Sequence, residues 1–207
     1  MTEPFVASFV GTAVEFFETA VIAYAIVRAG YPREALSALV VGHLTVFAAA
    51  MFLFPLHHAF PIFWLRLIAA VLLTSMGLHW SVKSAKRLHA HRRPGWAEAP
   101  LEEIGVVPRA SSAVAFSLFV FLVMGKSSVV EAAEILLVVF PVAAASNAWA
   151  EVLLGVAAGI TAVLIVGAAL HGQLKKVPEV KLKLVVGLVL TVLGLSWLLE
   201  LYRDYAM

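Results

Sequence analysis

The sequence predicts an all-α integral membrane protein with six transmembrane helices, arranged as two inverted three-helix repeats. The chain is 62% hydrophobic and only 14% charged, whereas soluble domains are nearer half apolar and a quarter charged. Its 207 residues contain six long apolar segments, and about 20 apolar residues are enough to cross a bilayer. Similar motifs recur in the two halves of the chain, and this indicates a duplication.

The apolar segments are separated by proline, glycine and charged residues, which typically end membrane helices. The first segment lacks a basic leader and a small-residue cleavage site, so we expect it to be retained. The fourth is longer than one span requires, and we expect a tilt or a break near Gly125. The expected segments are residues 5–27, 35–56, 62–82, 114–142, 150–170 and 182–201.

A polar stretch rich in Lys, Arg, Glu and Pro divides the chain. We therefore expect a first three-helix repeat in residues 1–85, a cytoplasmic linker in residues 86–112 and a second three-helix repeat in residues 113–207. The basic run of the linker is typical of a juxtamembrane anchor at an anionic lipid surface. No nucleic-acid partner is expected.

The distribution of Lys and Arg predicts the orientation. If the helices alternate in direction, one side receives only Arg66 and Arg203, and Lys126 lies within a segment. Cytoplasmic loops carry the excess of basic residues, so we expect a cell-membrane protein with both termini on the non-cytoplasmic side. The twelve cations expected on the cytoplasmic side are Arg28, Arg33, Lys83, Lys86, Arg87, Arg92, Arg93, Arg109, Lys175, Lys176, Lys181 and Lys183.

An internal repeat is visible in the third and sixth segments. Thr74–Trp80 reads Thr-Ser-Met-Gly-Leu-His-Trp, and Thr191–Trp197 reads Thr-Val-Leu-Gly-Leu-Ser-Trp, 117 residues later. We expect the two glycines to occupy equivalent helix contacts and the two tryptophans to lie near opposite interfaces. The second segments match weakly, through Gly42 and Gly155. Because each repeat has three spans, the second crosses the membrane in the opposite sense, as in many transporters.

Two acid pairs lie within the first and fourth segments, 116 residues apart: Glu15 with Glu18, and Glu131 with Glu134. Acids three residues apart share one face of a helix, and intramembrane acids are costly enough to indicate function. A two-fold axis between the repeats would bring all four together. Carboxylate oxygens suit iron(III), manganese, calcium or magnesium, so we predict a midplane metal site whose cation displaces protons.

Four further residues are candidate accessories to this site. His43 is either an additional ligand or proton relay, or a packed and hydrogen-bonded side chain. Lys126 is expected to pair with an acid on another helix. Thr12 and Ser128 offer hydroxyl oxygens, although such groups in membrane helices commonly bond back to their own backbone. The chain has no cysteine, which excludes thiolate metal sites, and no permanent cofactor is expected.

The paired motifs resemble those of the iron permease family, the oxidase-linked iron and lead transporters. Their hallmark is Arg-Glu-Gly-x-Glu in the first and fourth membrane helices, and the four glutamates stand at its acidic positions. The chain departs from the motif at its arginine, replaced by Val14 and Val130, and at its glycine, replaced by Phe16 and Ala132. The resemblance covers both acid helices and the three-plus-three plan, without a seventh helix. It implies iron as the transported cation.

Two alternatives remain open. Manganese/calcium cation–proton exchangers carry a duplicated Glu-x-Gly-Asp motif, but here the second acid is Glu and no Lys follows. A structural or accessory membrane subunit would use the acids only to bind helices together. The chain has no Gly-x-Ser-x-Gly, His-Glu-x-x-His or nucleotide loop, so no enzyme is expected. We therefore expect a metal permease whose partners are a metal cation, protons and the lipid bilayer. The sequence leaves open a homo-oligomer.

Overall fold

The computed structural model describes residues 2–108, 115–170 and 178–206, in which no strand occurs. Six helices in this part of the chain are long and apolar enough to cross a membrane. They are α1 (Glu3–Arg28), α2 (Pro32–Leu53), α3 (Ile62–His89), α6 (Leu118–Ser146), α7 (Trp149–Leu170) and α8 (Glu179–Ala206). The shorter elements are the 3₁₀-helix η1 (Phe54–Ala59) and the one-turn helices α4 (Gly95–Glu98) and α5 (Pro100–Glu103). The prediction of an all-α multi-pass membrane protein is confirmed.

Local sequence explains where these helices begin and end. Pro4 and Pro32 stand in the first turns of α1 and α2, where a missing backbone N–H costs nothing. The turn between these helices contains Gly30 with a φ of 96°, a backbone conformation that favours glycine after a helix end. Helix α6 ends at Asn147, whose φ of 54° is also left-handed.

Three expectations about segment bounds are wrong. Helix α3 continues to His89, so residues 86–89 of the expected linker are helical. Helix α6 passes through Gly125 and Pro141, so of the expected tilt or break the break does not occur. Helix α8 begins at Glu179, three residues before the expected sixth segment. Residues 109–112 of the expected linker lie outside the described residues.

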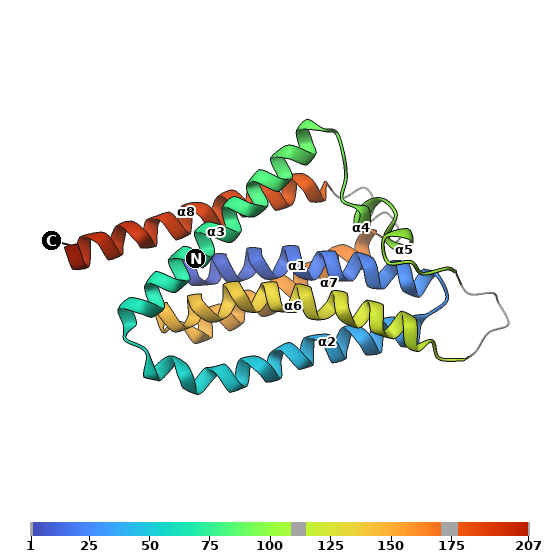
Figure 1. The fold of residues 1–207 in the computed structure, drawn as a ribbon, viewed down its shortest axis with the longest axis horizontal. Helices are drawn as coiled ribbons and strands as arrows, with labels where there is room; N and C mark the ends of the chain where they lie inside the picture. The colour runs from blue at the N-terminus through green and yellow to red at the C-terminus, as the bar shows by residue number, and fades with distance from the viewer. Residues whose placement is uncertain (1, 109–114, 171–177, 207) are drawn as a thin grey trace.

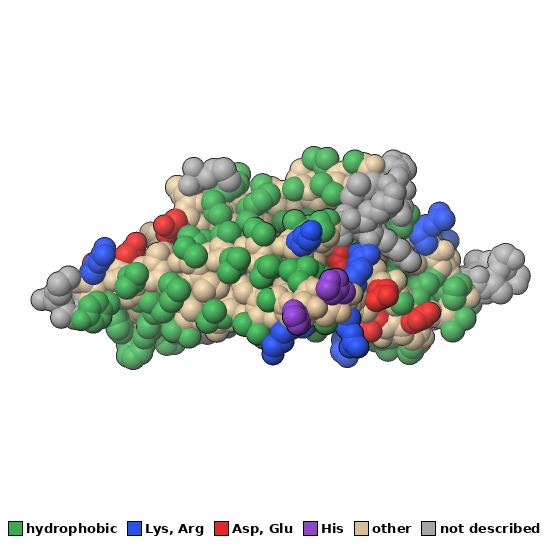
Figure 2. Space-filling model, turned by 90° about the horizontal axis from the view of Figure 1, so that it is seen from above, with side chains coloured by type: hydrophobic (Ala, Val, Ile, Leu, Met, Phe, Trp, Pro, Cys, Tyr) green, Lys and Arg blue, Asp and Glu red, His purple; other side chains and the backbone are tan. Residues whose placement is uncertain are grey.

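The outer faces of the bundle are apolar, as a lipid solvent requires. On α8 the exposed side chains recur every three or four residues, which places them on one face. They are Val185, Leu188, Val192, Leu195, Leu199 and Tyr202. Figure 2 shows most charged side chains on one face of the molecule gathered around the linker, with a smaller group at the opposite tip and hydrophobic side chains between. So large an exposed apolar surface is expected in a membrane rather than in water.

Helix α1 is the central element of the bundle, and it packs most extensively against α7 and α6. Helix α2 packs on α6, and α3 pairs with α8 along the other side of α1 (Figure 1). Helices α1 and α6 are antiparallel, because Gly11 lies against Val138 whereas Ile26 clusters with Val120. The core therefore surrounds the middle of α1, where Glu15 and Glu18 lie.

The contact between α3 and α8 depends on glycine. A Cβ on Gly77 would lie 2.5 Å from the Thr191 backbone nitrogen, and a Cβ on Gly194 would lie 2.6 Å from the Thr74 backbone nitrogen. The expected equivalence of these two glycines is confirmed. Lipid supplies no hydrophobic drive for helices to associate, so close backbone approach at small residues matters more than in water.

We predict that Gly77→Ala and Gly194→Ala each destabilise the fold by about 1–3 kcal/mol, since the added methyl group forces α3 and α8 apart. Gly167→Ala is the matched control, because nothing lies within 4 Å of a Cβ at that position. Thermal unfolding in detergent measures all three variants. Equal stability of the three would show that the α3–α8 contact tolerates side chains.

Candidate functional site

The structure brings three of the four predicted acids together. One carboxylate oxygen from each of Glu15, Glu18 and Glu131 lies within 4.8 Å of the others. Glu15 is 0% and Glu18 is 6% exposed, and Glu131 is half-buried. Two acids three residues apart on α1 therefore meet an acid of α6 in the interior of the bundle.

Glu134 lies beside this group rather than in it. It is half-buried one turn after Glu131 on α6. The group of carboxylates within 4.8 Å of one another does not include it. The four-acid cluster expected from the sequence is thus a cluster of three with a flanking fourth.

The acids share a cation that the sequence analysis missed. The ammonium nitrogen of Lys183 on α8 lies 2.6 Å from Glu18 Oε1 and 3.2 Å from Glu15 Oε1. The same nitrogen lies 5.0 Å from the ring centre of Trp80 on α3. Trp80 is 3% exposed, so its ring lies in the interior of the bundle.

Lys183 was expected at the cytoplasmic end of the sixth segment, and it lies in the second turn of α8. Its contact with the acids was not expected. The inward position of Lys183 could have been predicted from helical spacing. Lys183, Gly187 and Gly194 follow one another at steps of four and seven residues and so share a face, and the glycines of that face pack against α3. Arg109, Lys175 and Lys176, also expected in loops, lie outside the described residues.

A second ion pair anchors the start of α8. The Arg93 guanidinium donates to both oxygens of Glu179, from Nε to Oε1 at 2.8 Å and from Nη2 to Oε2 at 2.6 Å. This hydrogen bonding raises the pKa of Arg93 above its ordinary value. Glu179 is 6% exposed and lies one turn before Lys183. The linker therefore holds α8 in the position from which Lys183 reaches the acids.

We predict that Arg93→Gln lowers the free energy of unfolding by about 1–3 kcal/mol, because it leaves the buried carboxylate of Glu179 without its charged donor. Arg92→Gln is the matched control, since Arg92 is an exposed neighbour. Unfolding in detergent, followed by circular dichroism, measures both. The anchoring role is wrong if the two variants unfold alike.

His43 is packed and hydrogen-bonded between α2 and α6. Its Nδ1 lies 2.9 Å from Leu39 O and 2.9 Å from Ser128 Oγ, and the Ser128 hydroxyl donates to Leu39 O at 3.0 Å. With the hydroxyl proton used in that bond, Nδ1 carries the ring proton and Nε2 is left as an acceptor. Nε2 is buried and has no hydrogen-bond partner in the described part of the chain. His43 and Ser128 therefore support one another rather than the three carboxylates.

Of the two remaining accessory candidates, Thr12 lies close to the acids and Lys126 does not. Thr12 is 0% exposed on α1, one turn before Glu15. Its hydroxyl finds no hydrogen-bond partner among the described residues, which is uncommon for a buried polar group. Lys126 is exposed on α6, and among the described residues the ion pairs within 4.0 Å do not include it. The structure therefore does not bring Lys126 to the acids.

Two cavities approach the cluster. One of about 320 Å³ between α1, α7 and α8 reaches Glu18. Another of about 410 Å³ among α1, α2, α6 and α7 reaches Thr12 and His43. Both are lined mainly by apolar side chains; the charged groups of the first are Glu18 and Glu179, and the polar groups of the second include Thr12 and His43.

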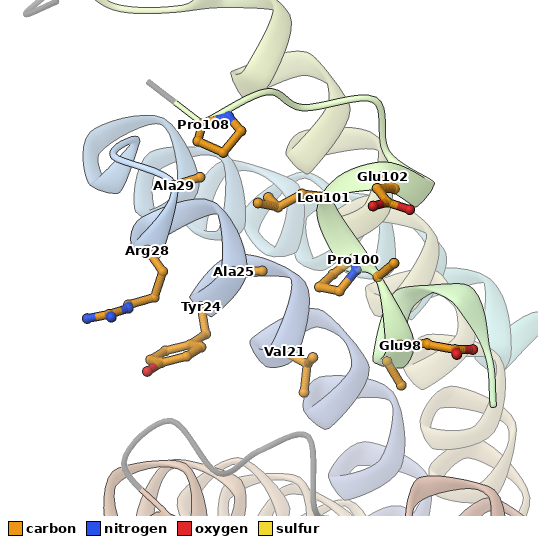
Figure 3. A pocket seen from close by; sticks show the side chains of 12 residues that line it. Val21, Tyr24, Ala25, Arg28, Ala29, Glu98, Pro100, Leu101, Glu102 and Pro108 are labelled. Carbon is orange, nitrogen blue, oxygen red and sulfur yellow. The ribbon is translucent and has the colours of Figure 1, made fainter. Parts of the chain in front are cut away.

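A third cavity, of about 550 Å³, lies away from the acids between the C-terminal part of α1 and the linker. Figure 3 shows Arg28 on the α1 side and the carboxylates of Glu98 and Glu102 on the opposite side, with small apolar side chains between. None of the four predicted acids lines it.

Comparisons with protein-family models, curated proteins and solved structures found no match to this chain. The function is therefore inferred from the geometry of the site.

Proposed function

We propose that this protein is a membrane permease for a hard metal cation, which binds between α1 and α6. The observation that carries the proposal is the meeting of Glu15, Glu18 and Glu131 within 4.8 Å. Three carboxylates concentrated inside a membrane bundle are costly, and several carboxylate oxygens in one place match the preference of hard cations. Glu134 extends the negative field beside the site. Iron is the cation implied by the resemblance to iron permeases.

Two inverted repeats related by a two-fold axis are part of the proposal. Glu15 and Glu131 are equivalent at the offset of 116 residues, and one carboxylate oxygen of each lies within 4.8 Å of the other. Contacts between equivalent residues arise at a two-fold axis. The contact between α3 and α8 follows the same rule. Gly77 lies against Thr191 and Gly194 lies against Thr74, and each residue of one pair is 117 residues from its counterpart in the other.

The second helices of the two halves support the same symmetry. A Cβ on Gly42 of α2 would meet Ser128 of α6, and a Cβ on Gly159 of α7 would meet Thr12 of α1. Ser128 follows Thr12 by 116 residues and Gly159 follows Gly42 by 117. These contacts favour Gly159, rather than Gly155, as the partner of Gly42 in the repeat. A site at the repeat interface is typical of inverted-repeat transporters.

The proposed orientation places the α1–α2 turn and the linker in the cytoplasm and both termini outside. We predict that Ala90→Cys, after α3, is labelled by an impermeant thiol reagent only from the cytoplasmic side. Ala59→Cys, at the end of η1, should be labelled only from outside. Both alanines are exposed. The natural chain has no cysteine, so no native thiol would react with the reagent. Labelling of both from one side would refute six alternating spans.

Metal binding at carboxylates requires their deprotonated forms, so protons and metal compete. Affinity should therefore fall as the pH is lowered. One cavity beside α1 reaches Glu18, and another reaches Thr12, one turn before Glu15.

We predict that Glu15→Gln, Glu18→Gln and Glu131→Gln each lower Mn²⁺ and Fe²⁺ uptake into proteoliposomes at least about tenfold, equivalent to about 1.4 kcal/mol. Glu134→Gln should lower uptake less, because Glu134 flanks the group. Glu200→Gln, at an exposed acid on α8, is the control and should transport normally.

The ion pairs of Lys183 favour a second candidate, a structural subunit whose acids only hold α1 to α8. In that case the Gln variants lose stability but metal has no effect on any of them. Unchanged uptake with Glu18→Gln and Glu131→Gln in folded protein would exclude the permease site.

A further inference from the structure

We propose that Lys183 is a tethered competitor of the transported cation. Its ammonium occupies the cation position at Glu15 and Glu18 when no metal is bound, and it leaves when metal binds. This inference rests on the proposed metal site and adds the residue that sets its affinity.

The geometry leaves no room for both cations at the same carboxylates. The Lys183 nitrogen bonds Glu18 at 2.6 Å and contacts Glu15 at 3.2 Å, and one oxygen of each belongs to the group that would hold a metal. A divalent ion bound to those oxygens would lie a few ångströms from the ammonium. Repulsion between two cations at that distance is severe where water is scarce, so one displaces the other.

The Trp80 ring lies beside the ammonium and would hold it after displacement. The Trp80 ring centre lies 5.0 Å from the Lys183 nitrogen, within the range of a cation–π interaction. Lysine carries a compact charge on a flexible four-carbon chain, so a small rotation transfers the ammonium from the carboxylates toward the ring. Trp80 is therefore inferred to hold the lysine while the metal is bound.

The competitor is present in one half of the molecule only. At the repeat offset of 117 residues, the counterpart of Lys183 is Arg66 on α3. Arg66 pairs with Asp204 at 3.7 Å, and these two side chains are 43% and 56% exposed. Lys183 is 15% exposed and paired with the cluster. The two halves are thus alike in their acids but not in their basic residues.

This arrangement has a consequence for transport. An empty cluster would hold several carboxylates in the membrane without a counter-charge, which is costly. Lys183 supplies that charge in the empty protein, and its competition weakens metal binding so that the cation can leave again.

Opposite changes in affinity at one position test the inference. In detergent, with Mn²⁺ as the probe in calorimetric titration, Lys183→Met should bind about tenfold more tightly than wild type, since couplings of this kind are typically 5–150-fold. Lys183→Arg should bind about tenfold more weakly, because a guanidinium fork bonds carboxylates in a bidentate manner. Lys181→Met, at an exposed lysine two residues away, should match wild type.

The outcomes separate the two proposals. If wild type binds Mn²⁺ and loses it with Glu18→Gln, while Lys183→Met and Lys183→Arg bind like wild type, Lys183 is only structural and the inference is wrong although the metal site stands. If neither wild type nor any variant binds Mn²⁺, the proposed site and the inference both fail. Should Lys183→Met not fold, Lys183→Arg decides alone, and unchanged or tighter binding by it overturns the inference.

Discussion

The burial of carboxylates in the middle of a membrane bundle is the constraint on which the rest of the structure depends. Glu15 is fully buried and Glu18 nearly so, and an unpaired charge in such a place is prohibitively costly. Lys183 supplies the opposite charge, because its ammonium bonds Glu18 and contacts Glu15. Every element that positions this lysine therefore supports the site.

Small residues place the helices close enough for that pairing. The glycine contacts of α3 and α8 set the two backbones together, so that Trp80 and Lys183 meet in the interior. The Arg93–Glu179 pair then ties the first turn of α8 to the linker. Helix packing, the linker and the acid cluster are thus parts of one arrangement, in which α8 places the Lys183 ammonium beside the acids in the middle of α1.

Features governed by local periodicity were predictable from the sequence. Six apolar segments gave six long helices, and acids three residues apart on α1 lie on one inward face as helical geometry requires. The matching of Gly77 with Gly194 followed from a repeated pattern and predicted equivalent contacts, which the structure makes between α3 and α8. In each case the determining residues are close together in the chain or repeat at a constant offset.

Features governed by tertiary contacts were not predictable in this way. Lys183 stands just before an apolar run, so its place inside α8 depends on where that helix begins. Lys126 lies within a helix yet faces outward, because the rotation of α6 is set by its contacts with α1 and α2. The expected break at Gly125 is absent, since a glycine that no neighbour approaches does not require a helix to bend.

The central claim is that the three carboxylates form a cation site. Its most direct test is a crystal structure of the protein grown with Mn²⁺, with data collected at a wavelength where manganese scatters anomalously. The account predicts one strong anomalous peak bonded to Glu15, Glu18 and Glu131, with the Lys183 ammonium moved from Glu18 toward Trp80. A structure in which Lys183 still bonds Glu18 and manganese appears only at surface acids would contradict it.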